Sequence, residues 1–399
     1  MEVVGVSPGD PFDRRTWSGA SHHLFTALGM HAELLGVVNA EIPRWADLFA
    51  KAAAIWPERH RWRERNEFSP VRRLISSRRA GRAATALARP GAAVLQVGAW
   101  YDAAARATPP AALRCSYHDS NLALLIRQGQ FVQQPDAGHI RRTLRAERRV
   151  FDGLDVIFTM SEWLRTSIIK DFEQDPDKVV VVGSGVNLKQ LPPPLRNRRA
   201  PSQTLLFVGF DFAGKGGQEI LQAFAQVRRR LPNARLQIVG PPPQSSVAGV
   251  EWIGAIDRSG SGDLRFQKIL ANATGFVLAS HYDAFPNVFL EAMAYSLPCI
   301  GTPVGGIPEI IQDGATGHLV PVGDIVQLAT AMEKVLADPD NAALMGEAGY
   351  RRVTERFTWD LVGRKMAHEI GRRLTQLPVS GEEALQSHAS SAAADHPSP

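Results

Sequence analysis

The chain has 399 residues, 44% of them hydrophobic, which is enough for two hydrophobic cores and predicts two or three domains. No apolar run approaches the roughly 18 residues that span a bilayer, and Pro, Gly and acidic residues interrupt the N-terminal segment, unlike a signal peptide. The net charge of +5 comes without a recognised nucleic-acid-binding motif, so we expect no nucleic-acid partner. Cys115 and Cys299 are too few for a disulfide framework or a zinc site, which favours a cytoplasmic location.

The first half of the chain reads as alternating strands and helices. A strand near Val3–Val6 leads through a loop, Trp17-Ser18-Gly19-Ala20, to a helix from about Ser21 to Leu28. Later strands are predicted at 93–97, 113–117, 155–160 and 179–182. His118 directly follows one of them, and parallel strands carry ligands at their carboxyl ends. His118 is therefore either a catalytic residue or a hydrogen-bonded loop residue.

Arginines are concentrated in the stretch 56–82, where Trp56, Trp62 and Phe68 are interleaved with them. Three interpretations remain open for this stretch. It is a solvated helical face, a contact with anionic lipid, or a site for an anionic ligand such as a lipid diphosphate. Further on, Pro192-Pro193-Pro194 and the arginine-rich segment 196–200 predict a stiff, exposed linker at a domain hinge.

The segment 204–243 predicts a β-α-β unit and hence a parallel sheet. The strand Leu205–Val208 ends at Gly209, Lys215-Gly216-Gly217 leads into a helix, and the next strand ends at Gly240. Lys215 then lies at the carboxyl edge of the sheet and at a helix start. It is either a phosphate clamp or a solvated loop lysine.

The segment 276–311 places two carboxylates, Asp283 and Glu291, around a loop and a helix that begins near Asn287. A helix N terminus offers unpaired N–H groups to a phosphate, and a nearby carboxylate can accept hydrogen bonds from sugar hydroxyls. Together they outline a nucleotide-sugar site. The alternative is an ordinary helix whose first turn carries Glu291 to complement the helix dipole.

Five blocks in order resemble the retaining glycosyltransferases of family 4, which have the GT-B fold. The blocks are SEWLR at 161–165, VVVVGSGVN at 179–187, FVG with KGG, the acid-x7-acid segment, and GGIPEIIQDGATGHLV at 305–320. The resemblance covers the C-terminal half well and the N-terminal half loosely. In two places the chain departs from the family: Asp283 stands where Glu is usual, and Phe210 where a basic residue is usual.

The resemblance implies an α/β fold of two Rossmann-like, doubly wound domains that face a cleft. It also implies transfer, with retention of configuration, of a hexose from a nucleoside-diphosphate sugar to a glycan, lipid-linked or small-molecule acceptor, as in polysaccharide biosynthesis. No cofactor besides the donor and no obligatory metal are implied. The rivals are a non-catalytic nucleotide-sugar or glycan-binding protein on this fold and a peripheral membrane-binding module.

Roles follow from the resemblance for individual residues. Lys215 and the N–H groups near Asn287 and Val288 stabilise the diphosphate, Glu291 holds the ribose, and Asp283 holds the sugar hydroxyls. The predicted catalytic residues are Lys215, Asp283 and His118, and the predicted substrate-binding residues are Gly19, Gly209, Gly240, Ala284, Phe285, Pro286, Asn287, Val288 and Glu291.

The predicted domains are an acceptor domain over 1–190, a donor domain over 200–357, a helix over 358–376 that returns to the first domain, and a disordered tail over 377–399. Asp175-Pro-Asp177 and Asp338-Pro-Asp340 mimic a metal-binding motif but are predicted to be turns at helix ends. We expect a cytoplasmic protein with a possible peripheral contact at the inner membrane face.

Overall fold

A computed structural model describes residues 1–13, 16–55, 57, 66, 68–106, 113–129, 137–194, 203–243, 246–258 and 261–376. Three sequence predictions fall wholly or partly outside these ranges. They are the arginine-rich stretch before Phe68, the linker after Pro194 and the tail 377–399.

The first of two sheets has six parallel strands in the order β2-β1-β3-β4-β5-β6. Its strands are β1 (Glu2–Ser7), β2 (Glu33–Asn39), β3 (Ala93–Val97), β4 (Leu113–His118), β5 (Val156–Thr159) and β6 (Val179–Val181). The central strands are apolar on both faces because helices cover both faces. Val3 and Leu95 pack with α1 (Ala20–Leu28) and α14 (Trp359–Gln376), whereas Val4 and Val94 face the other core.

The second sheet also has six parallel strands, in the order β12-β11-β10-β7-β8-β9. Its strands are β7 (Thr204–Val208), β8 (Arg235–Val239), β9 (Val250–Gly254), β10 (Gly275–Val277), β11 (Cys299–Gly301) and β12 (Gly317–Leu319). The predicted parallel β-α-β unit is confirmed, since β7 pairs with β8 in parallel register. The fold is GT-B, with two Rossmann-like, doubly wound domains.

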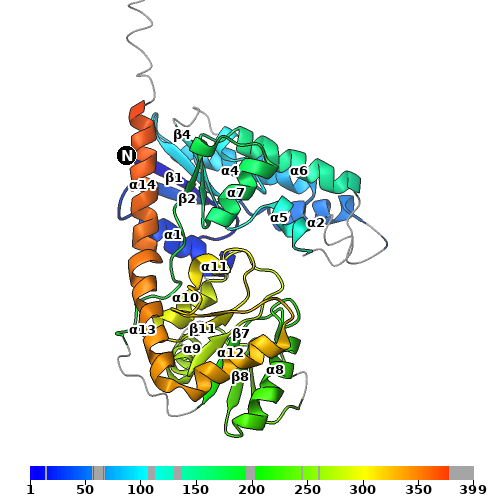
Figure 1. Cartoon of the computed structure of the whole chain (residues 1–399). Coiled ribbons are helices and arrows are strands. Elements are labelled where there is room, and N and C mark those ends of the chain that lie inside the picture. Colours follow the sequence, from blue (N-terminus) through cyan, green and yellow to red (C-terminus); the bar gives the residue numbers. More distant parts are fainter. Residues whose placement is uncertain are drawn as a thin grey trace, which may run out of the picture.

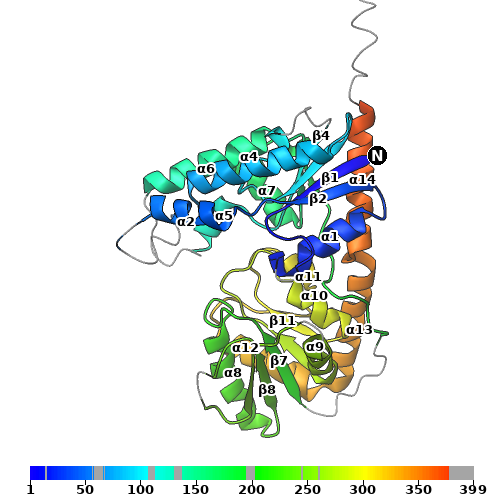
Figure 2. The same ribbon diagram turned by 180° about the vertical axis from the view of Figure 1, so that it is seen from behind.

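The helices of the first domain are α1, α2 (Arg44–Ala53), α4 (Pro70–Leu87), α5 (Leu122–Arg127), α6 (Ala137–Asp152) and α7 (Glu162–Asp171). Those of the second are α8 (Gly217–Arg230), α9 (Ser261–Asn272), α10 (Asn287–Ala294), α11 (Ile307–Ile310), α12 (Ile325–Ala337) and α13 (Pro339–Arg356). α13 and α14 follow one another along one side of the molecule, and α14 reaches the first domain (Figure 1). α2, α4 and α6 extend on the side away from α14 (Figure 2).

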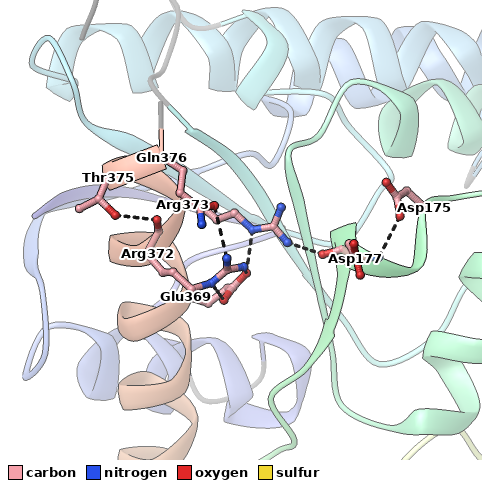
Figure 3. Close-up of polar contacts among 7 residues, drawn as sticks. All are labelled: Asp175, Asp177, Glu369, Arg372, Arg373, Thr375 and Gln376. Carbon is pink, nitrogen blue, oxygen red and sulfur yellow. Dashed lines mark hydrogen bonds and ion pairs between the residues drawn. The ribbon is translucent and has the colours of Figure 1, made fainter. Parts of the chain in front are cut away.

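The end of α14 is tied to the first domain by polar contacts (Figure 3). Arg373 donates to the carbonyl oxygen of Asp177 and is itself held by Glu369, with Nε 2.8 Å from the carboxylate. Closer to the domain junction, Gly363 lies against the backbone of Ala27 in α1, where a side chain would collide. These contacts anchor a helix from the end of the chain on the first sheet.

The two acidic segments lie at helix ends, as predicted, and the structure shows that their first aspartates are helix caps. The Asp175 carboxylate accepts the N–H of Asp177 at 2.9 Å, and the Asp338 carboxylate accepts the N–H of Asn341 at 3.0 Å. Both carboxylates are therefore engaged in local backbone hydrogen bonds. Within the described ranges, none of the helices combines the length and the apolar character that crossing a bilayer requires.

Candidate functional site

Glycines shape the loop that carries Lys215 from β7 to α8. Gly216 has φ +70°, and a Cβ added there would lie 2.0 Å from the carbonyl oxygen of Ala279. This left-handed position with a close backbone approach suits glycine alone. The loop after β7 is thereby pressed against the loop after β10, which brings Lys215 beside Asp283.

Lys215 and Asp283 form an ion pair between Nζ and Oδ2 although 68 positions separate them. Both side chains are mostly buried. Burial raises the pKa of the Asp283 carboxyl, and the neighbouring Lys215 ammonium opposes that rise. The sequence prediction assigned the two residues to different parts of a ligand, whereas the structure also makes them direct partners.

The loop that carries Asp283 rests on a glycine pair from the segment after β11. Gly305 has φ +56°, and a Cβ there would lie 1.7 Å from the carbonyl oxygen of Asp283. The N–H of Gly306 donates to the carbonyl oxygen of Ala284 at 2.7 Å. The GG of the block at 305–320 therefore supports the backbone of the predicted sugar-binding loop, and Gly306 also packs against the Phe285 ring.

Glu291 is only 4% exposed and pairs with Arg258, whose Nη1 lies 2.7 Å from Oε1. Arg258 also lies 3.7 Å from Asp263 and stacks over the Phe266 ring at 4.4 Å. Burial raises the pKa of the Glu291 carboxyl, and Arg258 opposes that rise. Sequence reasoning missed Arg258, because it belongs to no motif and 33 positions separate it from its partner.

The N terminus of α10 faces the first domain. Pro286 precedes the helix and provides no side-chain cap. Asn287 instead accepts a hydrogen bond from Ser184 of the first domain, with Oγ 3.2 Å from Oδ1. The predicted helix start near Asn287 is confirmed, and Val288 lies in its first turn.

Gly209 and Gly240 touch one another at the ends of β7 and β8. Gly240 has φ +122°, and a Cβ there would lie 2.3 Å from the carbonyl oxygen of Gly209. Backbone packing alone thus accounts for Gly240, and the substrate-binding roles of Gly209 and Gly240 stay predictions. Phe210, which replaces the usual basic residue, is 76% exposed beside them.

The first domain contributes a partly buried carboxyl, that of Asp119, close to the same place. Trp17 donates from Nε1 to Asp119 at 2.9 Å. Burial raises the pKa of Asp119, and the negative charge of Asp283 adds to the rise, so the carboxyls of the two domains approach each other. Gly19 has φ +84° and precedes the first turn of α1. The Trp17–Asp119 contact was not anticipated from the sequence.

The prediction that His118 follows its strand is wrong. His118 is the last residue of β4 and only 2% exposed, with Nε2 2.7 Å from the Ser116 hydroxyl and its ring against Phe151. Burial lowers the pKa of the imidazole to about 3, which keeps it neutral. The strand continues one residue further because His118 pairs in register with Thr159 of β5. A catalytic role for His118 stays a prediction.

Comparison with known proteins places the second domain in a family. Residues 202–338 match the family described as glycosyl transferases group 1. The glycogen synthase of Mycobacterium tuberculosis is 28% identical over 224 residues, which cover 53% of this chain and 53% of the relative. The N-acetyl-alpha-D-glucosaminyl L-malate synthase of Bacillus anthracis is 38% identical over 145 residues, 35% of this chain and 38% of the relative. The match to the glycogen synthase thus spans about half the length of that relative.

Solved structures resemble the whole chain. Sucrose-phosphate synthase from Thermosynechococcus elongatus aligns with a TM-score of 0.66 at 18% identity and covers 94% of this chain and 99% of that chain. Anabaena HepE in complex with UDP and glucose aligns with a TM-score of 0.65 at 14% identity and covers 93% and 100%. Identities this low bear on the fold alone. The chain is a GT-B protein, and its second domain is a group 1 glycosyltransferase domain.

Proposed function

We propose that the protein is a retaining glycosyltransferase that moves a hexose from a nucleoside-diphosphate sugar to a glycan, lipid-linked or small-molecule acceptor. The observation that carries the proposal is the meeting of Lys215 with Asp283 beside the uncapped N terminus of α10, which also carries Glu291. The relatives named above are synthases, which supports the catalytic alternative over a binding protein without activity.

The chemistry follows from the charges at this edge of the sheet. As the bond between sugar and diphosphate breaks, negative charge grows on the diphosphate. The Lys215 ammonium and the N–H groups of Asn287 and Val288 are preorganised to stabilise that charge. Asp283, paired with Lys215, would accept hydrogen bonds from the sugar hydroxyls together with the backbone of Ala284. Lys215 would thus contact both Asp283, which is proposed to hold the sugar, and the leaving diphosphate.

Glu291 is the proposed ribose contact. Its carboxylate is already engaged by Arg258, so a ribose hydroxyl would share Oε1 or use Oε2. We expect Glu291→Ala to weaken binding of a free nucleoside diphosphate. Asp283→Ala should weaken binding of the intact nucleotide sugar and leave the nucleoside diphosphate almost unaffected, because only the sugar reaches that carboxylate.

The experiment begins with a thermal-shift screen against nucleoside diphosphates and their sugars. A ligand at about 100 times its Kd stabilises the folded protein by about 2.7 kcal/mol. Calorimetric titration of the two variants with the best pair then tests the assigned roles, and the reverse pattern of losses would show that the roles are exchanged. Release of nucleoside diphosphate by the wild type distinguishes an enzyme from a binding protein. Turnover in EDTA tests the prediction that no metal is needed.

A peripheral membrane contact belongs to the proposal as a site on α2. Trp45, Leu48 and Phe49 lie on one face of this helix and are 62–70% exposed. Aromatic and aliphatic side chains beside an arginine-rich stretch suit the interface of an anionic bilayer. Replacing the three by Ser should abolish sedimentation with anionic vesicles and leave nucleoside-diphosphate binding intact. A cytoplasmic location stays a prediction.

A further inference from the structure

A pocket of about 830 Å³ opens in the first domain at the carboxyl ends of β1, β2 and β3. Its size is that of a site for a small molecule, and it is formed without the donor motifs of the second domain. Five arginines line it, from α4, from the short turn after β3 and from α6: Arg72, Arg73, Arg106, Arg142 and Arg149. The side of the pocket that these arginines form is called the arginine wall.

Arg73 is one of the two less exposed members of the arginine wall. It donates to the carbonyl oxygens of Ala99 and Trp100, but its Nη1 is buried without a hydrogen-bond partner among the described residues. Nε of Arg72 is likewise buried, with no hydrogen-bond partner among the residues that the structure describes. A buried donor left unpaired costs free energy, and a bound anion that accepts from it would recover that cost.

The arginine wall is only partly neutralised by the protein. Arg72 pairs with Asp47, but among the described residues no carboxylate lies within ion-pair distance of Arg73, Arg106, Arg142 or Arg149. Two further carboxyls lie near the wall, and one of them, that of Asp102, also lines the pocket. Asp102 caps the turn after β3, and Glu147 accepts the N–H of Leu122; burial raises the pKa of both, that of Glu147 to about 7. The wall therefore keeps a net positive charge.

Carboxylates line the pocket as well. Asp10, Asp13 and Glu41 line it from the loops after β1 and β2, together with Trp17. Trp17 donates a hydrogen bond to Asp119, and the negative charge of Asp283 in the second domain raises the pKa of the Asp119 carboxyl. A ligand that contacts the arginine wall can therefore also reach Trp17 and the carboxylates of the loop after β1, and carboxylates accept hydrogen bonds from hydroxyl groups.

We infer that the acceptor substrate carries a phosphate group, which the arginine wall binds while a hydroxyl at the other end faces the donor sugar. The inference rests on the proposed function. Arginine forks match the geometry of phosphate oxygens. The pocket is larger than a lone phosphate needs, so the phosphate is part of a larger molecule, either a soluble phosphate monoester or the head of a lipid phosphate.

The test uses two exposed arginines of the wall on α6, because substitutions at exposed positions usually change stability little. Arg142→Ala with Arg149→Ala is compared with Arg141→Ala with Arg145→Ala, a matched pair on the same helix that does not line the pocket. Lys215→Ala serves as the control for phosphate binding in the donor site. The soluble probe is glycerol 3-phosphate against glycerol by calorimetry. The lipid probe is a polyprenyl phosphate in phosphatidylcholine vesicles, measured by sedimentation.

We expect one phosphate probe to bind the wild type, the matched pair and Lys215→Ala alike, and to bind the wall pair at least tenfold more weakly, as loss of charged hydrogen bonds predicts. Glycerol should not compete. Equal affinity for the wall pair and the matched pair would overturn the inference, as would loss of phosphate binding in Lys215→Ala. If nucleoside diphosphate binds every arginine variant while neither phosphate probe binds the wild type, the inference fails alone. If no nucleoside diphosphate binds the wild type, the proposed function fails.

Discussion

Removing Arg258 should destabilise the protein through Glu291. Glu291 is buried, and Arg258→Ala leaves its carboxylate without a cationic partner. Breaking a buried pair costs about 3–5 kcal/mol, whereas exposed pairs contribute below about 1 kcal/mol. Because the Arg258 side chain is 35% exposed, we expect an intermediate loss of about 2 kcal/mol. At about 2–4 °C for each kcal/mol in a domain of this size, Tm should fall by about 4–8 °C.

The loss should depend on pH in a defined direction. Burial raises the pKa of Glu291 above its ordinary value of 4.5, so the folded state binds a proton there more tightly than the unfolded chain. Stability from this group is therefore present at low pH and lost as pH rises through the folded pKa. Without Arg258 the folded pKa rises further, so the penalty should be full at pH 8 and smaller at pH 5.

The assay is urea denaturation of Arg258→Ala at both pH values, with Arg265→Ala, an exposed arginine of the neighbouring helix α9, as the matched control. The double variant Arg258→Ala with Glu291→Gln should recover most of the loss, because it removes the buried charge. A penalty within about 0.5 kcal/mol of the Arg265→Ala control, the usual range of surface substitutions, would refute the reasoning. So would an equal penalty at pH 5 and pH 8.

Three further predictions concern the donor loops and the domain junction. Lys215→Ala should lower kcat by about 10² or more in a donor-turnover assay, whereas exposed Lys268→Ala should not; unchanged kcat/KM in folded Lys215→Ala would remove it from the site. Gly216→Ala should cost about 1–3 kcal/mol in thermal denaturation, and wild-type stability would mean that the loop avoids Ala279 by moving. Glu309 caps α7 across the domain junction, since its two carboxylate oxygens each lie 2.9 Å from a backbone nitrogen in the first turn of that helix. Glu309→Ala should therefore lower the free energy of unfolding by about 1 kcal/mol in urea denaturation, and Glu309→Gln should lower it less.

The sequence by itself determined the features that depend on near neighbours. The β7–α8–β8 unit, the start of α10 at Asn287 and the position of the two acidic turns at helix ends were all predicted. Hydrophobic periodicity and capping act over a few residues, so the chain reveals them without its fold. The motif order was also sufficient to predict the family of the second domain and the parallel sheets. It identified Lys215, Asp283 and Glu291 as candidates, although their roles remain to be tested.

Only the tertiary structure decided which of these residues are partners. Arg258 forms an ion pair with Glu291, and Glu309 of the second domain caps α7 of the first by hydrogen bonds. No spacing in the sequence predicts these contacts. The arginine wall likewise combines side chains of α4, α6 and the turn after β3. Such pairings depend on the order of strands in the sheets and on the approach of the two domains, because side chains far apart in the chain meet only after both sheets have formed. The burial of His118 has the same cause, since its strand lies inside the first sheet between β3 and β5.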